Sequence, residues 1–406
     1  MLKFPIYLDH NATTPCDPRV VEAMLPWFTE NFGNAASRTH AYGWQAEEAV
    51  KLAREQVATL IGAEESEIVF TSGATEAVNL AIKGVFEMYS RKGNHIITVK
   101  TEHKAVLDTC AHLEKLGAEI TYLNVDEEGL INVNELTAAI KPSTVLIAVM
   151  YANNETGVIQ PIDQISAIAK QRGVLFFTDA SQAVGKIPVS VAGIDIMAFS
   201  AHKFYGPKGV GALYVRRKDP RVKLTAQMDG GGHEKGMRSG TLNVPGIVGL
   251  GVACEIARNN DSTGLSVLRD KLENELRKIP GSDPDNNSGN IVINGSRINR
   301  LPHVTNISFR NFEPAGSLIS AINKEIAVSS GSACTSASME PSYVLKAMNV
   351  SDDLAYNSIR FSLGRNTTEE EIDYVINKIK GIYHDIRKRQ SETEGNRINA
   401  GAESYR

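Results

Sequence analysis

Two polar residues, Asp179 and Lys203, stand at the ends of strand-like segments near the middle of the chain. Asp179 follows the apolar run 174–178, and Lys203 follows the run 194–199. Strand ends are where an open α/β sheet builds its site. A lysine there can form a Schiff base with pyridoxal 5'-phosphate (PLP), while a carboxylate keeps the pyridine nitrogen protonated. Each residue alone would more simply be a surface lysine or a helix N-cap, so the PLP hypothesis depends on further parts of such a site.

A turn of small residues is the candidate phosphate site. Residues 70–76, with the sequence FTSGATE, follow a predicted strand and open a predicted helix. Small residues let the backbone approach a ligand closely, the first amides of the helix can bind an anion, and Thr75 adds a hydroxyl. The simpler alternative is a helix capped by Ser72 or Thr75. No Gly-x-x-x-x-Gly-Lys-Ser/Thr motif is present, which argues against an NTPase.

Three further polar positions lie at or near predicted strands. His103 follows the run 96–99 and could stack on a planar cofactor or transfer a proton. Asn154 is the second residue of an Asn-Asn pair after an apolar strand, where the amides could bind a substrate or simply form a turn. Arg360 lies in a segment that alternates like a strand, and its guanidinium could clamp a carboxylate or form a surface ion pair.

Cys334 differs from the other cysteines in its surroundings. It lies in the small, polar segment 328–338, which predicts a mobile loop that could carry a nucleophilic thiol into a site, although a serine-rich linker is the alternative. Cys16, Cys110 and Cys254 are far apart without a Cys-x-x-Cys pair, so neither a zinc site nor a disulfide framework is expected. Cys110 and Cys254 are expected in the core, and Cys16 half exposed in a turn.

Apolar runs alternate with amphipathic segments between about residues 67 and 215, which predicts a mainly parallel sheet covered on both faces. The last strands follow one another without a full helix between them, so part of the sheet is expected to be mixed. The predicted strands are 68–71, 96–99, 120–123, 145–150, 174–178, 196–200 and 211–215. The predicted helices are 75–89, 105–116, 133–139 and 162–171, followed by helical segments at 249–258 and 265–279.

The chain is long enough for two domains. We expect an N-terminal arm (1–15) that packs with the small domain, a large domain (16–260), a small α+β domain with the Cys334 loop (261–388), and a disordered tail (389–406). The 406 residues carry a net charge of −4 with 42% hydrophobic residues, which does not favour binding of nucleic acid or anionic membranes. We find neither a signal peptide nor an apolar run of membrane-spanning length, so a cytoplasmic location is expected.

With these parts in order, the chain resembles the cysteine desulfurases of the long-loop subgroup, which belong to the class-V aminotransferase group of fold-type I PLP enzymes. The matching runs are 7–15, 70–76, 101–106, 153–155, 179–182, 200–203, 230–241, 329–336 and 359–365. They span nearly the whole chain. The resemblance implies a PLP-dependent transferase fold, with a large domain built on a mainly parallel seven-stranded sheet and a smaller α+β domain.

The resemblance also assigns roles to single residues. It implies that Lys203 carries the PLP and shuttles a proton, that Asp179 pairs with the pyridinium nitrogen, and that Gln182 contacts the ring hydroxyl. It places His103 on the ring, and the Ala74 backbone, Thr75, Ser200 and His202 at the phosphate. Thr241 would contact the phosphate of a neighbouring subunit, which implies a homodimer. Asn154 and Arg360 would bind the carboxylate of L-cysteine, with Asn154 also near the cofactor.

By the same resemblance, Cys334 attacks the substrate sulfur and takes it as a persulfide, leaving L-alanine. No metal ligand set is predicted, although Cys334 could ligate a transient iron–sulfur cluster. The sulfur would pass to an acceptor protein, either an iron–sulfur scaffold or another sulfur carrier. The tail lacks the hydrophobic ending that relatives use to dock the scaffold, so the acceptor stays open. Ala201 replaces a glycine that is common in relatives, which we expect to be tolerated.

Two other hypotheses stay open on the sequence alone. A selenocysteine lyase or an ordinary transaminase would keep PLP but change the reaction, and a transaminase needs no thiol such as Cys334. A non-catalytic protein that inherited the fold would not need the full set of polar residues described above.

Overall fold

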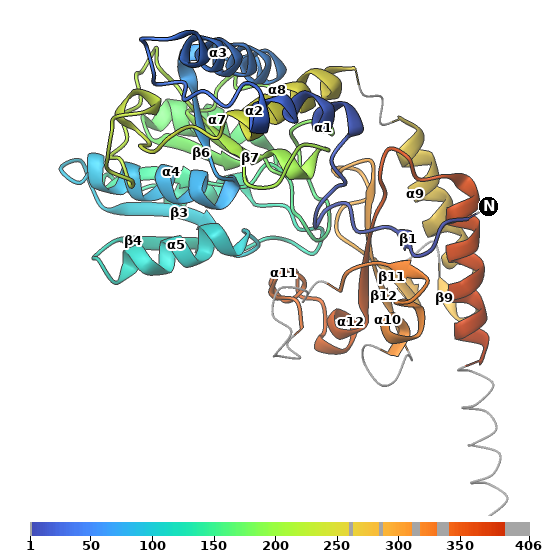
Figure 1. Ribbon diagram of the computed structural model, residues 1–406. Coiled ribbons are helices and arrows are strands. Elements are labelled where there is room, and N and C mark those ends of the chain that lie inside the picture. The colour runs from blue at the N-terminus through green and yellow to red at the C-terminus, as the bar shows by residue number, and fades with distance from the viewer. Residues whose placement is uncertain (1, 260–262, 284–286, 311–316, 331–340, 386–406) are drawn as a thin grey trace, which may run out of the picture. The chain divides into compact units, whose positions relative to one another are not determined.

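The computed structural model describes residues 2–259, 263–283, 287–310, 317–330 and 341–385 (Figure 1). These residues form two compact units. The large unit comprises the described residues of 11–262 and 295–301, and the small unit those of 2–10, 263–294 and 302–385. The N-terminal division thus falls between His10 and Asn11, five residues before the boundary expected after residue 15. The expected disordered tail, 389–406, lies outside the described residues.

A seven-stranded sheet forms the centre of the large unit, in the order β2-β8-β7-β6-β5-β3-β4. Its strands are β2 (Ile68–Thr71), β3 (His95–Val99), β4 (Glu119–Leu123), β5 (Thr144–Ala148), β6 (Leu175–Asp179), β7 (Ile196–Ser200) and β8 (Gly211–Val215). All seven predicted strands are present, and the mainly parallel sheet is confirmed. Only β8 runs antiparallel to its neighbours β7 and β2. The connection from β7 to β8 contains no full helix, and a parallel crossover would need one.

Helices surround this sheet. They are α1 (Pro18–Met24), α2 (Pro26–Thr29), α3 (Ala41–Ile61), α4 (Ala74–Met88), α5 (Lys104–Glu114), α6 (Val133–Ala139), α7 (Ile162–Arg172) and α8 (Val244–Arg258), with short 3₁₀ turns η1 (Glu65–Glu67), η2 (Ala201–Lys203) and η3 (Glu234–Gly236). The apolar sides of α4 and α5 share one buried cluster with the sheet. Strands β2, β3, β5, β7 and β8 have no exposed side chain, as expected for a sheet buried on both faces.

Helix α8 begins earlier than its predicted start at residue 249. Asn243 caps it by accepting a hydrogen bond from the Gly246 amide. Pro245 occupies the first turn, where the backbone N–H that proline lacks would have no partner within the helix. Helix α3 was not predicted, and it packs closely against α8. A Cβ on Gly251 of α8 would lie 2.8 Å from the Ala53 Cα of α3, so this contact requires a glycine.

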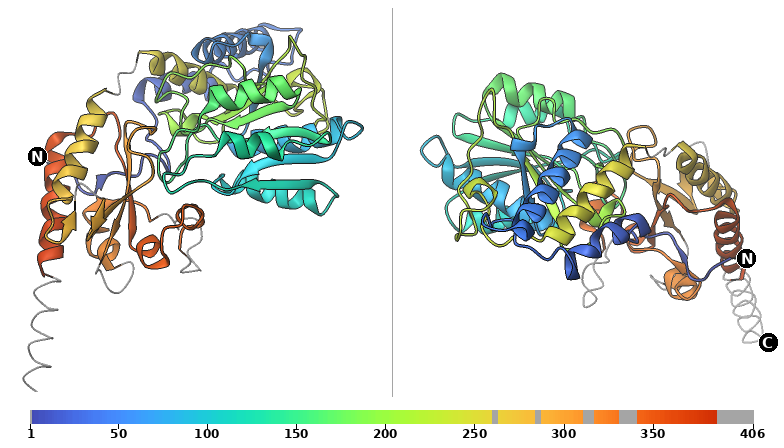
Figure 2. Two further views of the ribbon diagram at one scale, coloured as in Figure 1. Left: turned by 180° about the vertical axis from the view of Figure 1, so that it is seen from behind. Right: turned by 45° about the horizontal axis from the view of Figure 1, so that its top comes forward.

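The small unit is built on the antiparallel sheet β11-β12-β14. Its strands are β1 (Ile6–Tyr7), β9 (Ser282–Asp283), β10 (Ser288–Gly289), β11 (Ile291–Asn294), β12 (Val304–Phe309), β13 (Ile326–Ala327) and β14 (Ser358–Ser362). Its helices are α9 (Thr263–Leu276), α10 (Ser317–Ile322), α11 (Tyr343–Ala347), α12 (Asp352–Tyr356) and a helix over 369–385. Strand β1 pairs with β13, and Ile6 and Leu8 belong to this unit's core. Both views of Figure 2 show the N-terminal segment beside the C-terminal helix of the same unit.

Candidate functional site

The carboxyl ends of six of the seven strands lie at one edge of the large sheet, and five of these strands are followed by predicted site residues. Strands β3, β5, β6 and β7 run parallel, and β2 shares their direction because it is antiparallel to β8. The turn after β2, the segments that follow β3 and β5, the end of β6 and the residues after β7 therefore lie at this edge. Most of the predicted site residues come from these five places, as the rule for open α/β sheets predicts.

Asp179 is the last residue of β6, at the middle of this edge, and it is buried. Its Oδ1 accepts hydrogen bonds from the Ser181 amide at 2.9 Å and the Ser181 hydroxyl at 2.6 Å. Both bonds hold the carboxylate in one orientation and use the same oxygen. Oδ2 therefore keeps its capacity to accept a hydrogen bond from a protonated ring nitrogen, as the prediction for Asp179 requires.

Lys203 ends η2, directly after the neighbouring strand β7. Its Nζ donates to the carbonyl oxygens of Asn11 at 2.7 Å and Ala12 at 2.9 Å. Strand β7 pairs with β6, with Asp179 opposite Ala198. The amine and the carboxylate that the sequence singled out thus follow adjacent strands of one sheet.

Asn11 is a central residue of the site that the sequence did not assign. Its carbonyl oxygen accepts hydrogen bonds from Lys203 Nζ and, at 3.1 Å, from the side-chain nitrogen Nε2 of Gln182. Its side chain accepts from Lys186 Nζ at 3.2 Å and donates to the Asn154 carbonyl at 3.1 Å. Gln182 Oε1 accepts from Lys186 Nζ at 2.7 Å, which fixes the orientation of that buried amide. The polar run Asn-Ala-Thr-Thr could have drawn attention to this segment, but a run of polar residues does not indicate which distant residues it contacts.

The next residues of the same segment bind His202. The Thr14 amide and hydroxyl donate to the His202 carbonyl at 2.9 and 3.0 Å, and the His202 Nδ1 lies 3.1 Å from the Thr13 hydroxyl. Burial, together with the charges of Lys203, Lys208 and Lys186, lowers the pKa of His202 to about 4. The ring is therefore neutral near pH 7, and it could serve a phosphate as a hydrogen-bond donor rather than as a cation.

The turn between β2 and α4 has the form of an anion site. Gly73 precedes α4 with φ 152°, a conformation that favours glycine, and no side chain caps the first amides of the helix. The capping by Ser72 or Thr75 that the sequence left open is therefore absent. A Cβ on Gly73 would lie 3.6 Å from the Ser200 hydroxyl at the end of β7. Ser200 thus faces this turn, while Ala74 is partly buried and Thr75 exposed in the first turn of α4.

His103 precedes α5 and caps it through its ring. The Nδ1 accepts from the Ala105 amide at 3.1 Å, so the neutral ring carries its hydrogen on Nε2. The half-buried ring is thereby held in one orientation at the end of β3. This geometry suits a ring that stacks on a cofactor, and that role stays a prediction.

The two adjacent asparagines after β5 differ in their contacts. Asn153 Oδ1 accepts from the amides of Glu155 and Thr156, and its Nδ2 donates to the Thr101 carbonyl at 3.0 Å. Asn153 therefore forms the turn that the sequence gave as the alternative. Asn154 is half buried and bonds to Asn11 through its carbonyl. Its predicted role in binding cofactor and substrate stays a prediction.

Glu102 is a buried carboxyl group that the sequence did not single out for a role. It precedes His103, has no exposed surface, and accepts a hydrogen bond from the Met150 amide through Oε1. Its pKa is raised well above the usual range, mainly by burial and also by the charge of Asp179. We therefore expect Glu102 to be protonated and neutral, so that Asp179 is the one negatively charged carboxylate of the two.

Replacing Glu102 with glutamine is expected to flatten the dependence of stability on pH. The raised pKa means that the folded protein holds a proton that the unfolded chain releases above its ordinary pKa of 4.5, so this group's stabilisation is lost as pH rises. The slope is about 1.4 kcal/mol per pH unit while only the folded state is protonated. Thermal unfolding of the PLP-free protein between pH 5.5 and 8.5 measures it, and parallel curves for Glu102→Gln and the unaltered protein would contradict the assignment.

The remaining predicted residues come from other segments of the chain or lie outside the described residues. Thr241 is exposed in the segment between η3 and α8. Arg360 lies in β14 of the small unit, where it is buried and pairs with Asp9 Oδ1 at 2.6 Å, so the surface ion pair considered from sequence is a buried one. Cys334 lies outside the described residues. Within the described ranges, no group of three His, Cys, Asp or Glu side chains could hold a metal ion.

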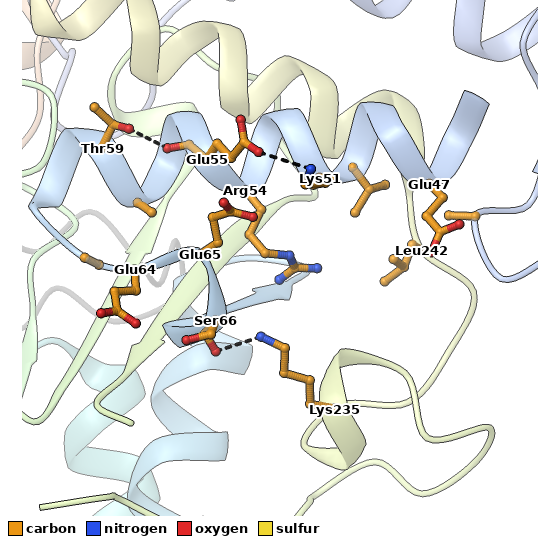
Figure 3. Close-up of a pocket in the computed structure, with 14 residues that line it drawn as sticks. Glu47, Lys51, Arg54, Glu55, Thr59, Glu64, Glu65, Ser66, Lys235 and Leu242 are labelled. Atoms are coloured by element: carbon orange, nitrogen blue, oxygen red, sulfur yellow. Dashed lines mark hydrogen bonds and ion pairs between the residues drawn. The ribbon is translucent and has the colours of Figure 1, made fainter. Parts of the chain in front are cut away.

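A cavity of about 1030 Å³ lies elsewhere in the large unit, along α3 (Figure 3). It is lined by charged side chains of both signs, among them Arg54 and Glu55 of α3, and by Lys235 and Leu242. None of the predicted site residues lines it. In the figure, Arg54 of α3 and Lys235 of η3 face the same space, and Lys235 bonds to the Ser66 carbonyl.

Comparison with known proteins defines the class. Residues 6–375 match the family "Aminotransferase class-V", and the chain therefore belongs to that family. Within it, the chain groups with the cysteine desulfurases, as the sequence predicted. "Cysteine desulfurase IscS" of Anaeromyxobacter sp. (strain K) is 56% identical over 380 residues, covering 92% of this chain and 91% of that protein. The protein of the same name from Edwardsiella ictaluri (strain 93-146) is 55% identical, covering 93% of each.

Solved structures agree with this assignment. A "NifS-like protein" has a TM-score of 0.85 and 38% sequence identity, covering 94% of this chain and 100% of that one. "SspA in complex with cysteine" has a TM-score of 0.78 and 38% identity, covering 89% of this chain and 100% of that one. The described part of the chain contains no helix both long enough and apolar enough to cross a membrane.

Proposed function

We propose that this protein is a PLP-dependent cysteine desulfurase, which converts L-cysteine to L-alanine and takes up the sulfur on Cys334. The observation that carries the proposal is the placement of Lys203 and Asp179 after adjacent strands, with the amine held by two carbonyls and the carboxylate oriented by Ser181. The identity of 56% to a relative named cysteine desulfurase supports the reaction.

The residues of the site can form the hydrogen bonds that the phosphate and the ring nitrogen of PLP require. An anion can bind at the uncapped amides after Gly73 together with Ser200, and Asp179 Oδ2 can accept from a ring nitrogen. The residues that would hold the cofactor are Ala74, Thr75, His103, Asn154, Asp179, Gln182, Ser200, His202 and Lys203, with Thr241 from a neighbouring subunit. When bound, PLP supplies an electron sink for the bond that breaks at the substrate Cα.

The chain's own groups perform the remaining work. Asn154 and Arg360 bind the substrate carboxylate, and the Lys203 amine removes the proton from Cα and later returns a proton to the product. The Cys334 thiolate forms a bond to the substrate sulfur while the bond between that sulfur and Cβ breaks. The balance is L-cysteine plus the Cys334 thiol giving L-alanine plus a Cys334 persulfide, with no external oxidant needed.

A second copy of the chain is the subunit partner in this proposal. Large apolar side chains of the large unit are exposed between α1 and the start of α3, at Leu25, Phe28, Phe32, Tyr42 and Trp44. Several large apolar side chains exposed in one short stretch of chain are typical of an interaction surface, and the ring centroids of Phe32 and Tyr42 lie 5.1 Å apart. Thr241 is exposed as well, as a residue that serves a neighbouring subunit must be.

The persulfide sulfur passes to an acceptor protein, an iron–sulfur scaffold or another sulfur carrier. A reducing compartment suits this transfer, because an acceptor thiolate must attack the persulfide. Cys16, Cys110 and Cys254 are free thiols, which fits the cytoplasm.

Incubation of the purified protein with L-cysteine tests the proposal. We expect alanine and transferable sulfur in equal amounts, and peptide mass spectrometry should find one added sulfur atom on Cys334. A keto acid in place of alanine would indicate transamination instead. Added sulfur on Cys16 would disprove the nucleophile assignment, and turnover of L-selenocysteine alone would make the protein a selenocysteine lyase.

A further inference from the structure

Arg238 links the glycine-rich segment 229–241 to the first turn of α4. Its Nε donates to Glu76 Oε1 at 2.8 Å and its Nη2 to Glu76 Oε2 at 3.4 Å. Both side chains are largely buried, with 17% and 18% of their surface exposed. An ion pair with this degree of burial holds its geometry better than a solvated one.

Glu76 also binds the turn that precedes the helix. Its Oε2 accepts a hydrogen bond from the Ser72 amide at 2.8 Å, next to Gly73. One carboxylate thus joins the candidate phosphate turn to the segment that ends in Thr241. Burial would raise the pKa of Glu76, but the hydrogen bonds from Arg238 and Ser72 lower it overall, so the group is an anion.

Two residues, Glu234 and Lys235, bind the start of this segment to α3, η1 and β2. Glu234 pairs with Arg54 at 2.7 Å and accepts from the Phe70 amide at 2.8 Å, while Lys235 donates to the Ser66 carbonyl at 2.7 Å (Figure 3). These contacts lie before the turn and do not touch it. Among the described contacts of segment 234–238, the pair of Arg238 and Glu76 is therefore the one that reaches the turn.

The position of Glu76 creates an electrostatic conflict with the proposed function. An anion at the first turn of a helix is favourable by itself, but a phosphate at the same amides would be repelled by it. Arg238 neutralises Glu76 through charge-assisted hydrogen bonds without occupying the turn's own amides. The carboxylate can then orient the Ser72 amide at little electrostatic cost to the phosphate.

We propose that Arg238 and Glu76 are a positioning pair for the cofactor phosphate: Glu76 fixes the Ser72–Ala74 turn, and Arg238 neutralises Glu76 so that a phosphate can bind there. The inference rests on the proposed function, because it requires that PLP binds at this turn. It concerns affinity for the phosphate group and assigns neither residue a part in the chemical step.

Titration of the PLP-free protein with PLP and with pyridoxal, which lacks the phosphate, tests the pair. We expect Arg238→Met to weaken PLP binding by about tenfold, because the uncompensated charge of Glu76 then repels the phosphate, with pyridoxal binding unchanged. Adding Glu76→Gln should restore most of the PLP affinity, because glutamine can still accept from the Ser72 amide but carries no charge. Arg238→Lys, which keeps the charge, should fall between the unaltered protein and Arg238→Met.

Lys235→Met is the matched control, since Lys235 lies in the same segment but bonds only to Ser66 among the described contacts, and PLP affinity should be unchanged. The proposal is overturned if Arg238→Met binds PLP normally, if it weakens PLP and pyridoxal equally, or if Glu76→Gln restores nothing. Thermal unfolding of each PLP-free variant separates loss of folding from loss of affinity. If the unaltered protein binds no PLP, the proposed function itself fails, which is a distinct result.

Discussion

Replacing Lys203 with alanine is expected to abolish alanine formation from L-cysteine while the protein still folds. The Lys203 amine donates to the carbonyls of Asn11 and Ala12, so it is held at the end of β7 beside the strand that ends in Asp179. Without it, the site has lost the group that anchors the cofactor and the base that moves the Cα proton. A positioned general base alone contributes about 10² to 10⁴ in rate. Alanine release and the visible absorption of the purified protein measure the two losses.

Lys208→Ala serves as the control for this substitution. Lys208 is an exposed lysine five residues further along the same connection between β7 and β8, and it should leave alanine formation unchanged. The half-buried side chain of Lys203 can be removed without a large apolar cavity, so the thermal midpoint should change little. If Lys203→Ala keeps the visible absorption of the unaltered protein, the assignment of the anchoring lysine is wrong.

The central sheet could be predicted from the sequence because its strands are continuous apolar runs between turn residues. The missing helix between the last strands predicted that part of the sheet is mixed, and the structure shows that β8 is the antiparallel strand. Helix α3 could not be found in the same way. Its buried face consists largely of small residues, among them Gly43, Ala46, Ala53 and Ala58, which give a weak amphipathic signal although they allow close packing against α8.

In the candidate site, too, residues in a recognisable local sequence pattern could be predicted, and residues defined by contacts distant in sequence could not. Asp179 and Lys203 could be singled out because parallel strands bring their carboxyl ends to one edge, whereas Ser200 came only from the family resemblance. Asn11 could not, because its partners lie 143 to 192 residues away and no local pattern pairs an N-terminal asparagine with them. The pair of Glu76 and Arg238, 162 residues apart, was hidden for the same reason.

The described cysteines narrow the choice of nucleophile in a way that the sequence did not. A thiol attacks as its thiolate, so a raised pKa makes it inert near neutral pH. Burial raises the pKa of Cys110 to about 12 and that of Cys254 still further. The pKa of Cys16 is raised too, by burial and then by Asp17. Burial therefore excludes Cys110 and Cys254, and the preference for Cys334 over Cys16 rests on the small, polar neighbours of Cys334 in sequence.

Replacing Cys334 with alanine is accordingly expected to reduce both sulfide and alanine formation to background while PLP binding is retained. The bond between the substrate sulfur and Cβ breaks only as an acceptor takes the sulfur, so removing the acceptor stops both products together. The excess L-cysteine supplies the thiol that releases the persulfide sulfur as sulfide and forms a disulfide in turn, so Cys16→Ala, measured in parallel without any other thiol, should keep the full rate. Because Lys203→Ala loses the bound cofactor and Cys334→Ala does not, the two variants separate the anchoring of the cofactor from the transfer of sulfur. Sulfide release by Cys334→Ala at the unaltered rate would show that another group accepts the sulfur.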